Sequence, residues 1–334
     1  MLILILLSLV LATSCSCDLP SDEHTFRVVS YNVQNLFDAN IDGDEYPEYK
    51  DPKLWNLSSY RQRLRTLSSV VLDPALSYPD VLVFQEVEGA NVIEDLLTFH
   101  LKRRGYRWYA CSKDEGSAIA VAVVSRHPIT NCVVHGGQQF RSVLEVEIET
   151  IRSSIIIFAL HAKSQKGDFF ETEAQRLLQI KALREPLQHQ NDALLLLCGD
   201  FNENPDTIWH SGGVPTALVD YTHPRAPALI ENGSLGITGN KHLLGPRLWY
   251  APYLDQELTF DHEGSCNWDG KWHRYDQILG NDKIYDRRGW EFDAFCICAP
   301  SRTLASDGRP DAWNLALKSG VSDHLPVMLT LKCR

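Results

Sequence analysis

Positive charge is in deficit in this 334-residue chain, where 32 Lys and Arg residues face 43 Asp and Glu residues, giving a net charge of −11. Long-range attraction to nucleic acid requires net or local positive charge. The composition therefore argues against tight non-specific binding to DNA, although a basic patch or a bound metal can offset the deficit. Small phosphoesters and metal-bridged substrates remain compatible with the acidic balance.

The N-terminal apolar run is too short to cross a membrane. Residues 2–11 are almost all apolar, and small residues with Cys15 and Cys17 follow. A bilayer requires roughly 20 apolar residues, whereas a run of this length is typical of a signal-peptide core. The small residues before Cys15 resemble a bacterial lipoprotein processing site. We therefore expect residues 1–17 to direct export, with Cys15 carrying the lipid.

We therefore expect the protein to be located in the bacterial cell envelope, where a lipid anchors it facing the periplasm or the cell surface. The alternative is a cleaved signal that leaves no lipid, in which case the protein is secreted. In both cases contact with a membrane is expected only through the N-terminal anchor, and no protein partner is predicted.

The remaining cysteines lack a recognisable pairing pattern. Seven of the nine remain beyond Cys15 and Cys17, an odd number without the spacing of a small disulfide scaffold. Cys198 falls in an apolar strand and is expected to be buried. Cys296 and Cys298 are two residues apart, which predicts two thiols on one face of a strand and not a zinc knuckle.

The chain also lacks repeats, low-complexity blocks and an internal linker, so we expect a short linker at residues 18–25 and one α/β domain over residues 26–334. Apolar periodicity predicts helices at residues 57–71, 91–104 and 171–189, the last with Leu177, Leu178, Leu183 and Leu187 facing inward. Loops are expected at 38–55 and 203–265. Strands are predicted at residues 26–33, 80–86, 106–111, 117–125, 130–135, 141–150, 153–161, 193–198, 273–280, 294–299 and 324–332.

Polar residues stand at the ends of these apolar segments, where a packed core presents side chains to one cleft. Each has an ordinary explanation when taken alone, such as a turn residue or a helix cap. The pair that follows the 193–198 strand is more informative, because polarity beside a buried strand is costly. The residues in question are Asn32, Glu86, His161, Asp200, Asn202, Asp276, Asp323 and His324.

Six segments that contain these residues resemble the endonuclease/exonuclease/phosphatase family, and they occur in the family's order. They are Tyr31-Asn32-Val33-Gln34-Asn35-Leu36-Phe37-Asp38, Gln85-Glu86-Val87-Glu88, Leu160-His161-Ala162-Lys163-Ser164, Gly199-Asp200-Phe201-Asn202, Tyr275-Asp276-Gln277-Ile278-Leu279 and Ser322-Asp323-His324-Leu325-Pro326. Within this deoxyribonuclease-I-like family, residues 32–38 look most like a branch of secreted bacterial nuclease-related proteins. Residues 264–276 resemble a Gly-aromatic-Gly-x-Trp segment that precedes the Asp276 position in some bacterial members.

The resemblance implies a four-layer α/β/β/α sandwich of two mixed, mainly antiparallel sheets with outer helices. It also implies roles for the site residues. Glu86 would bind Mg²⁺ or Mn²⁺, with Ca²⁺ a further candidate, and Asn32 and Asp323 would lie close by. Asp200 and Asn202 would position the attacking water and the phosphate, and His324, oriented by Asp276, would contact the phosphate. His161 would be a second imidazole, which disfavours a role in abasic-site repair.

Four further residues are weaker candidates for substrate contacts. Arg141 and Lys163 are expected to contact phosphate. Trp268 and Trp272 are expected either to stack on a base or sugar or to pack beneath the cleft.

The function expected from these observations is that of an exported, metal-dependent phosphodiesterase acting as a nuclease on DNA or RNA. A phosphomonoesterase, or a hydrolase of phospholipid or inositol-phosphate headgroups, remains an alternative that uses the same site. A surface lipoprotein that only binds its ligand is a third alternative, from a different class. The complete set of paired carboxylates and imidazoles argues against it.

Overall fold

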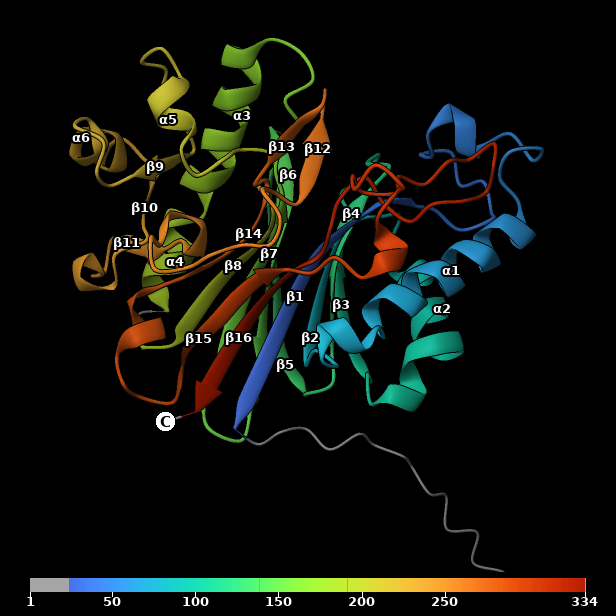
Figure 1. The fold of residues 1–334 in the computed structure, drawn as a ribbon, viewed down its shortest axis with the longest axis horizontal. Coiled ribbons are helices and arrows are strands. Elements are labelled where there is room, and N and C mark those ends of the chain that lie inside the picture. Colours follow the sequence, from blue (N-terminus) through green and yellow to red (C-terminus); the bar gives the residue numbers. More distant parts are fainter. Residues whose placement is uncertain (1–23, 138, 191, 334) are drawn as a thin grey trace, which may run out of the picture.

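The computed structural model describes residues 24–137, 139–190 and 192–333, and two β-sheets lie at its centre (Figure 1). The first has the order β15 (Trp290–Ile297), β16 (Val327–Cys333), β1 (Thr25–Leu36), β2 (Val81–Val87), β4 (Ala120–Ser125) and β3 (Trp108–Ser112). The second has the order β5 (Ile129–Gly137), β6 (Phe140–Ile148), β7 (Ile155–His161), β8 (Leu194–Asp200), β14 (Asp276–Gly280), β11 (Leu248–Tyr250), β10 (Leu235–Thr238) and β9 (Leu218–Asp220). A separate hairpin joins β12 (Cys266–Trp268) to β13 (Lys271–His273).

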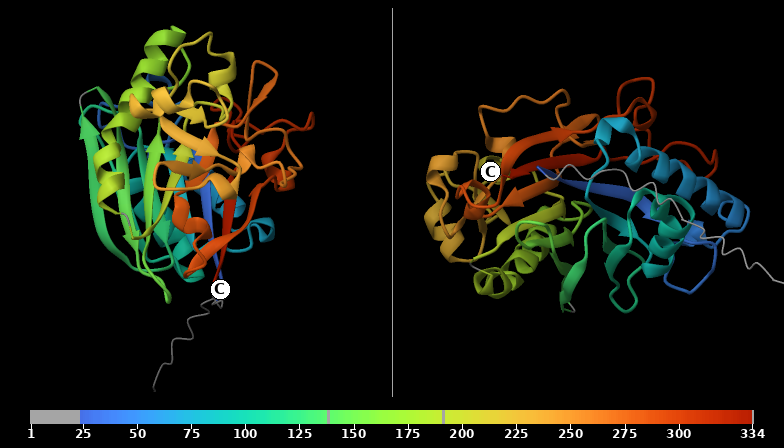
Figure 2. Two further views of the ribbon diagram at one scale, coloured as in Figure 1. Left: turned by 90° about the vertical axis from the view of Figure 1, so that its left-hand side faces the viewer. Right: turned by 90° about the horizontal axis from the view of Figure 1, so that it is seen from below.

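Most neighbouring strands pair antiparallel, while β1–β2, β7–β8, β9–β10 and β10–β11 are parallel. Helices cover the outer faces. In Figure 1, α1 (Leu57–Val71) and α2 (Ala90–Leu96) lie on the right and α3 (Phe169–Ala182) on the left, with the strands between them. The additional views in Figure 2 show the same arrangement. The predicted sandwich of two mixed sheets with outer helices is confirmed.

The buried side chains of the central strands explain why their sequences are apolar without alternation. In β8, Leu196 and Cys198 pack between the two sheets, while Leu195 and Leu197 pack on the side of α3. Successive side chains of a strand point to opposite faces, and here both faces are covered. The prediction that Cys198 is buried is therefore confirmed.

The first helix has the predicted bounds. Asn56 precedes it, and its side-chain oxygen accepts hydrogen bonds from the N–H groups of Ser58 and Ser59. This is the usual role of an N-cap residue, because the first N–H groups of a helix lack partners within it. Leu64 and Leu67 then face the core of the first sheet.

The predicted helix at 171–189 is wrong in two respects. It is divided into α3 and α4 (Arg184–His189), because Pro186 has no N–H to continue the hydrogen-bond ladder of α3. Leu178, which was expected to face inward, is exposed, whereas Leu183 is buried as expected. The inward stripe of α3 is largely polar and includes Glu173 and Arg176.

Two further predictions differ from the structure. The predicted helix at 91–104 consists of α2, a π-helical turn (Leu97–Leu101) and a 3-10 turn (Lys102–Arg104). The segment 203–265, predicted as loop, contains strands β9, β10 and β11 at one end of the second sheet and the short helices α5 (Thr207–His210) and α6 (Ala226–Glu231). These strands have three or four residues, which is too few for a periodic signal. Further 3-10 turns are Pro47–Tyr49, Pro74–Leu76, Lys241–Leu243, Pro252–Leu254, Asp282–Tyr285 and Ser301–Thr303.

The predicted signal segment, Cys15 and most of the predicted linker lie outside the described residues. Strand β1 begins at Thr25, within the stretch expected to be linker. Among the described helices, none is long and apolar enough to cross a membrane. The thiols of Cys296 and Cys298 lie 3.6 Å apart, which confirms that they share one face of the chain.

Candidate active site

Strand pairing brings the polar residues of distant segments to one edge of the two sheets. Strands β7 and β8 are parallel and β14 is antiparallel to β8, so His161 and Asp276 are both in register with Asp200. In the other sheet, the parallel strands β1 and β2 place Asn32 beside Gln85, the residue before Glu86. The residues that end these apolar strands therefore meet, as the sequence predicted.

Gly199 permits the close approach of β7 and β8 at this edge. Its φ is +151°, and a Cβ at this position would lie 1.9 Å from the carbonyl oxygen of Leu160. Any larger residue would separate the two strands. The glycine thereby keeps Asp200 level with His161.

A β-bulge directs the carboxylate of Glu86 into the site. The register of β2 shifts between Gln85 and Val87, and Glu86 has a φ of +63°. This conformation is uncommon for a residue with a side chain, and it is concentrated at functional sites. The carboxylate accepts hydrogen bonds of 3.0 Å from the Asn32 amide and from the N–H of Asn35.

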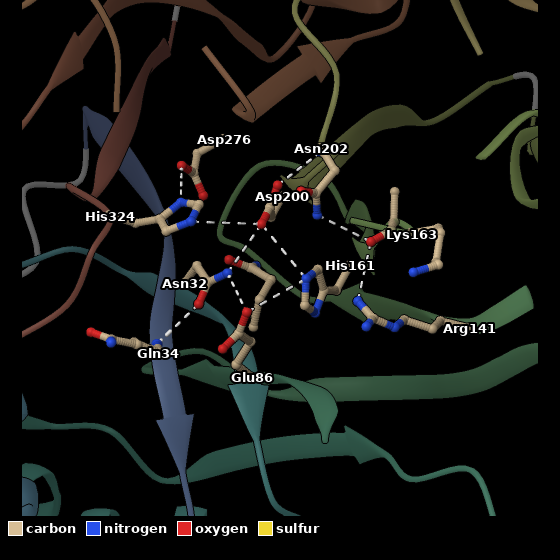
Figure 3. A network of polar contacts seen from close by, with 12 residues as sticks. Asn32, Gln34, Glu86, Arg141, His161, Lys163, Asp200, Asn202, Asp276 and His324 are labelled. Carbon is tan, nitrogen blue, oxygen red and sulfur yellow. Dashed lines mark hydrogen bonds and ion pairs between the residues drawn. The ribbon is translucent and has the colours of Figure 1, made fainter. Parts of the chain in front are cut away.

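Asp200 lies at the centre of the cluster, between two imidazoles (Figure 3). Its Oδ2 accepts a 3.0 Å hydrogen bond from the Asn32 amide and is 3.6 Å from His161 Nε2 and 3.9 Å from His324 Nε2. The N–H of Asn202 donates to Oδ1 over 2.8 Å. Burial, opposed by the charge of His324, raises the pKa of Asp200 to about 7. The carboxyl group can therefore accept a proton near neutral pH.

His324 is held by a buried carboxylate. Its Nδ1 is 2.7 Å from Asp276 Oδ2, and the Ser265 hydroxyl donates to that same oxygen over 2.6 Å. Burial lowers the pKa of His324, but the Asp276 carboxylate outweighs this effect, so the pKa lies well above its ordinary value. The imidazole therefore favours the charged form.

His161 has the opposite tendency. Burial, together with the positive charges of Arg141 and His324, lowers the pKa of His161 well below its ordinary value. Its Nε2 is 3.7 Å from Glu86 Oε1. Figure 3 shows Arg141 on the side of His161 away from His324, and the guanidinium donates to the carbonyl of Ala162 over 3.1 Å. The site thus combines one neutral and one charged imidazole.

A cavity of about 410 Å³ opens onto this cluster. Glu86, Asp200, Asn202, Asp323 and His324 line it, whereas Asn32, His161 and Asp276 lie behind the lining residues. The cavity continues past Ser164, Gln165, Lys166, Cys266, Trp268, Asp269, Lys271, His273 and Tyr275.

The donor set fits a hard divalent cation. The carboxylates of Glu86 and Asp323 both line the cavity, and burial followed by the charge of Asp323 raises the pKa of Glu86. A cation beside them would relieve this repulsion, and oxygen ligands suit Mg²⁺ or Mn²⁺. Asp200, Asp276 and His324 also have donor atoms within 4.8 Å of one another, but His324 Nδ1 already bonds Asp276. Glu86 and Asp323 therefore remain the candidate ligands, and their binding of a cation stays a prediction.

The side chain of Asn32 is already engaged in hydrogen bonds within the protein. Its amide nitrogen donates to Glu86 and Asp200, and its oxygen accepts the N–H of Gln34 over 3.0 Å. Asn32 therefore holds the two carboxylates together, and its direct contact with a metal stays a prediction.

The four weaker candidates for substrate contacts differ in whether they line the main cavity. Trp268 lines the main cavity and is 48% exposed, whereas Trp272 is half-buried against the core between the sheets. Arg141 lines a small cavity beside His161. Lys163 lies outside the main cavity, where the neighbouring Lys166 is found instead. Phosphate contacts by Arg141 and Lys163 stay predictions.

Several supporting residues were not singled out from the sequence. Ser322 donates to the carbonyl of Asn32, and the side chain of Gln34 accepts the N–H of Asp323. Both lie within the six recognised segments, which were a usable signal. Ser265 and the buried pair Glu173–Arg176 gave no comparable signal. Ser265 lies 11 residues before its partner Asp276, and an i,i+3 ion pair on a helix is ordinarily a surface feature.

The chain belongs to the endonuclease/exonuclease/phosphatase family, whose model matches residues 29–324. The match includes all eight polar residues at the strand ends. No curated protein sequence matches the chain significantly.

Solved structures of the same fold accompany this match. A protein of the family from Bacteroides thetaiotaomicron is 16% identical, with a TM-score of 0.53 over 92% of this chain and 94% of that one. TDP2 from Caenorhabditis elegans is 15% identical, with a TM-score of 0.52 over 92% and 74% of the two chains. Staphylococcus aureus beta toxin is 16% identical, with a TM-score of 0.51 over 91% and 99%. These similarities establish the fold.

Proposed function

We propose that this protein is an exported phosphodiesterase that uses Mg²⁺ or Mn²⁺ to hydrolyse P–O bonds with water, and that nucleic acid is its substrate. The observation that carries the proposal is the position of Asp200 between two imidazoles, beside Glu86, on a cavity of about 410 Å³. Family membership supports the class of reaction.

The charges of the site match those of the reaction. In-line attack of water on phosphorus builds negative charge on the non-bridging oxygens and on the leaving oxygen. A divalent ion at Glu86 and Asp323 supplies charge neutralisation when bound. His324, charged and held by Asp276, donates a hydrogen bond to the phosphate. Asp200 takes the proton of the attacking water, because its raised pKa makes it a base near neutrality.

Asn202 and His161 complete the proposed roles. The Asn202 side chain lines the cavity and is fixed by a 3.2 Å hydrogen bond to the carbonyl of Ala162. It can therefore orient the phosphate. His161 lies behind the lining residues and favours its neutral form, so its Nε2, 3.6 Å from Asp200 Oδ2, can support that carboxylate without adding positive charge.

Export rests on the sequence of the first 17 residues, where an apolar run is followed by small residues and Cys15. We propose that Cys15 carries a lipid that anchors the enzyme in the cell envelope. Secretion without a lipid is the alternative form of this proposal.

A second candidate function is hydrolysis of phosphomonoesters or of phospholipid or inositol-phosphate headgroups by the same residues. The net charge of −11 favours it, because an acidic protein gains little from long-range attraction to a polyanion. A phosphomonoester has one ester bond on its phosphate and nucleic acid has two, which separates a phosphomonoesterase from a nuclease. A phospholipid headgroup is joined through a diester, as nucleic acid is, so a headgroup hydrolase differs from a nuclease in the groups attached to the phosphate.

The distinguishing experiment supplies the purified protein with bis-p-nitrophenyl phosphate, a diester, and p-nitrophenyl phosphate, a monoester. We expect diester turnover with Mg²⁺ or Mn²⁺, its loss in EDTA and its return when the ion is restored. Turnover of the monoester alone would favour a phosphomonoesterase, and release of headgroups from phospholipid vesicles without cleavage of DNA would favour a headgroup hydrolase. A folded protein that hydrolyses neither compound would contradict both.

A further inference from the structure

The β12–β13 hairpin turns one face toward the cavity. Its cross-strand pairs are Cys266 with His273, Asn267 with Trp272, and Trp268 with Lys271. Side chains that are directly opposite each other project on the same face, and adjacent pairs alternate between the two faces. The pairs of Cys266 and of Trp268 line the cavity, which leaves Trp272 facing the core.

The hairpin is tied to the catalytic cluster. Ser265, immediately before β12, bonds Asp276 through its hydroxyl, and its carbonyl accepts the N–H of Leu325 over 2.7 Å. Cys266 also forms a β-bridge with His324. The segment that presents Trp268 therefore also supports the Asp276–His324 pair, so the distance between indole and phosphate site is fixed by the backbone.

The turn of the hairpin adds rigidity. Asp269 and Gly270 have φ values of +49° and +74°, and they form the two-residue loop between the paired Trp268 and Lys271. An Asp-Gly loop with two positive φ values matches the right-handed twist of a tight hairpin. Trp268 consequently stands on a rigid support.

Trp268 presents an indole face beside positive charge. It is 48% exposed, and the ammonium group of Lys166 lies 5.2 Å from its ring centroid. Lys271, its cross-strand partner, also lines the cavity. One end of the cavity thus carries His324 and the carboxylates of Glu86, Asp200 and Asp323. The other end carries the indole and the two lysines, together with Asp269 and His273.

We propose that Trp268, with Lys166 and Lys271, forms a subsite for an unpaired nucleobase and its adjoining phosphate next to the scissile bond. This inference rests on the proposed phosphodiesterase function and narrows its substrate to single-stranded nucleic acid or strand ends. A base stacks on an aromatic ring whatever its identity. A base within a duplex would first have to leave the helical stack, which costs free energy.

The hairpin is less suited to insertion into a lipid surface. Its tip consists of Asp269 and Gly270, and the exposed indole is flanked by Lys166 and Lys271. Membrane insertion requires apolar residues at the leading end of the segment. Trp268 also lines the cavity that contains the phosphate site, where a nucleotide flanking the scissile bond would lie.

The test measures binding separately from turnover. Fluorescence anisotropy in EDTA at low ionic strength would give Kd for a labelled single-stranded oligonucleotide and for the same strand with abasic units in place of nucleosides. Trp268→Ala should weaken binding of the normal strand about 5- to 150-fold, the effect of losing one stacked base. Trp268→Phe should retain most of the affinity, and Trp268→Ala should bind the abasic strand as the wild type does.

Trp209→Ala is the matched control, because Trp209 is also 48% exposed and does not line this cavity. It should bind both strands normally. The proposed subsite would be contradicted if Trp268→Ala bound the normal strand with an unchanged Kd, or if its affinity for the abasic strand fell equally. It would also be contradicted if the wild type bound duplex DNA more tightly than the single strand. A Trp268→Ala variant that binds both strands normally but no longer binds phosphatidylcholine vesicles would also contradict the subsite. That result would show that the hairpin binds lipid. Turnover of bis-p-nitrophenyl phosphate, assayed in parallel, reports on the proposed function independently.

Discussion

His324 Nδ1 and Asp276 Oδ2 lie 2.7 Å apart, with both side chains buried at the edge where the two sheets meet. The carboxylate fixes the orientation of the ring, so that Nε2 faces Asp200. It also offsets the cost of placing a charged imidazole out of water. Asp276, at the start of β14, thus determines both the orientation and the charge of His324, which lies 48 residues later in the chain.

Asp276→Asn should reduce diester turnover by about 10²-fold and shift the alkaline limb of the pH–rate profile to lower pH. Asp276 raises the pKa of His324, so without its charge the imidazole loses its proton at lower pH. The profile of kcat/KM against pH measures this effect. Asp307→Asn, at an exposed carboxylate paired with Arg309, should match the wild type. An unshifted alkaline limb in Asp276→Asn would contradict the assigned role.

Glu86→Gln should abolish or greatly weaken the binding of Mg²⁺, because the amide removes the charge that attracts the cation. Titration calorimetry would measure the affinity, and circular dichroism would check that the fold persists. Glu149→Gln, at an exposed carboxylate, provides the control. If Glu86→Gln bound Mg²⁺ as tightly as the wild type, the cation would have to lie elsewhere in the cluster.

Glu203→Gln should make stability less dependent on pH. Glu203 is fully buried, and burial together with Glu173 raises its pKa well above the ordinary 4.5. The folded chain therefore keeps a proton that the unfolded chain releases above about pH 4.5. The wild type should lose up to about 1.4 kcal/mol per pH unit through this group as the pH rises from there to the folded-state pKa.

Glutamine is neutral at every pH, so the variant should gain stability relative to the wild type between pH 5 and pH 8. Urea unfolding at several pH values measures the difference. The exposed Glu231→Gln serves as a comparison. Parallel stability curves for Glu203→Gln and the wild type would show that Glu203 is charged in the folded protein.

Cys15→Ala should convert a membrane-associated protein into one that is released by washing or secreted, because the expected lipid would be missing. Fractionation of cells that express each form, with mass spectrometry of the mature N-terminus, would reveal the outcome. Cys17→Ala is the control, since Cys17 lies two residues beyond the expected processing site. An unmodified N-terminus in the wild type would exclude the anchor.

The sequence allowed prediction of those parts of the site that end long apolar strands. Asp200 follows a run of leucines, and His161 follows a run of isoleucines, so both positions could be located before the fold was known. The four-layer arrangement followed from the family resemblance, and the buried strands agree with it. The 57–71 helix was predicted correctly from its apolar spacing, and Asn56 caps its first turn in the structure.

The remainder depended on contacts that local patterns do not encode. Arg176 appeared to be an ordinary charged helix residue, but it pairs with Glu173 inside the protein and donates to the carbonyl of Lys163. The choice between Trp268 and Trp272 required the register of a three-residue hairpin strand. Ser265 could be assigned only once the fold placed it against Asp276.

The most direct test is the rate of Mg²⁺-dependent hydrolysis of bis-p-nitrophenyl phosphate by His324→Ala, compared with the wild type at equal folded concentration. The account predicts a loss of about 10²-fold or more, since the charged imidazole would no longer stabilise the phosphate. A folded variant that hydrolyses the diester at the wild-type rate would contradict it.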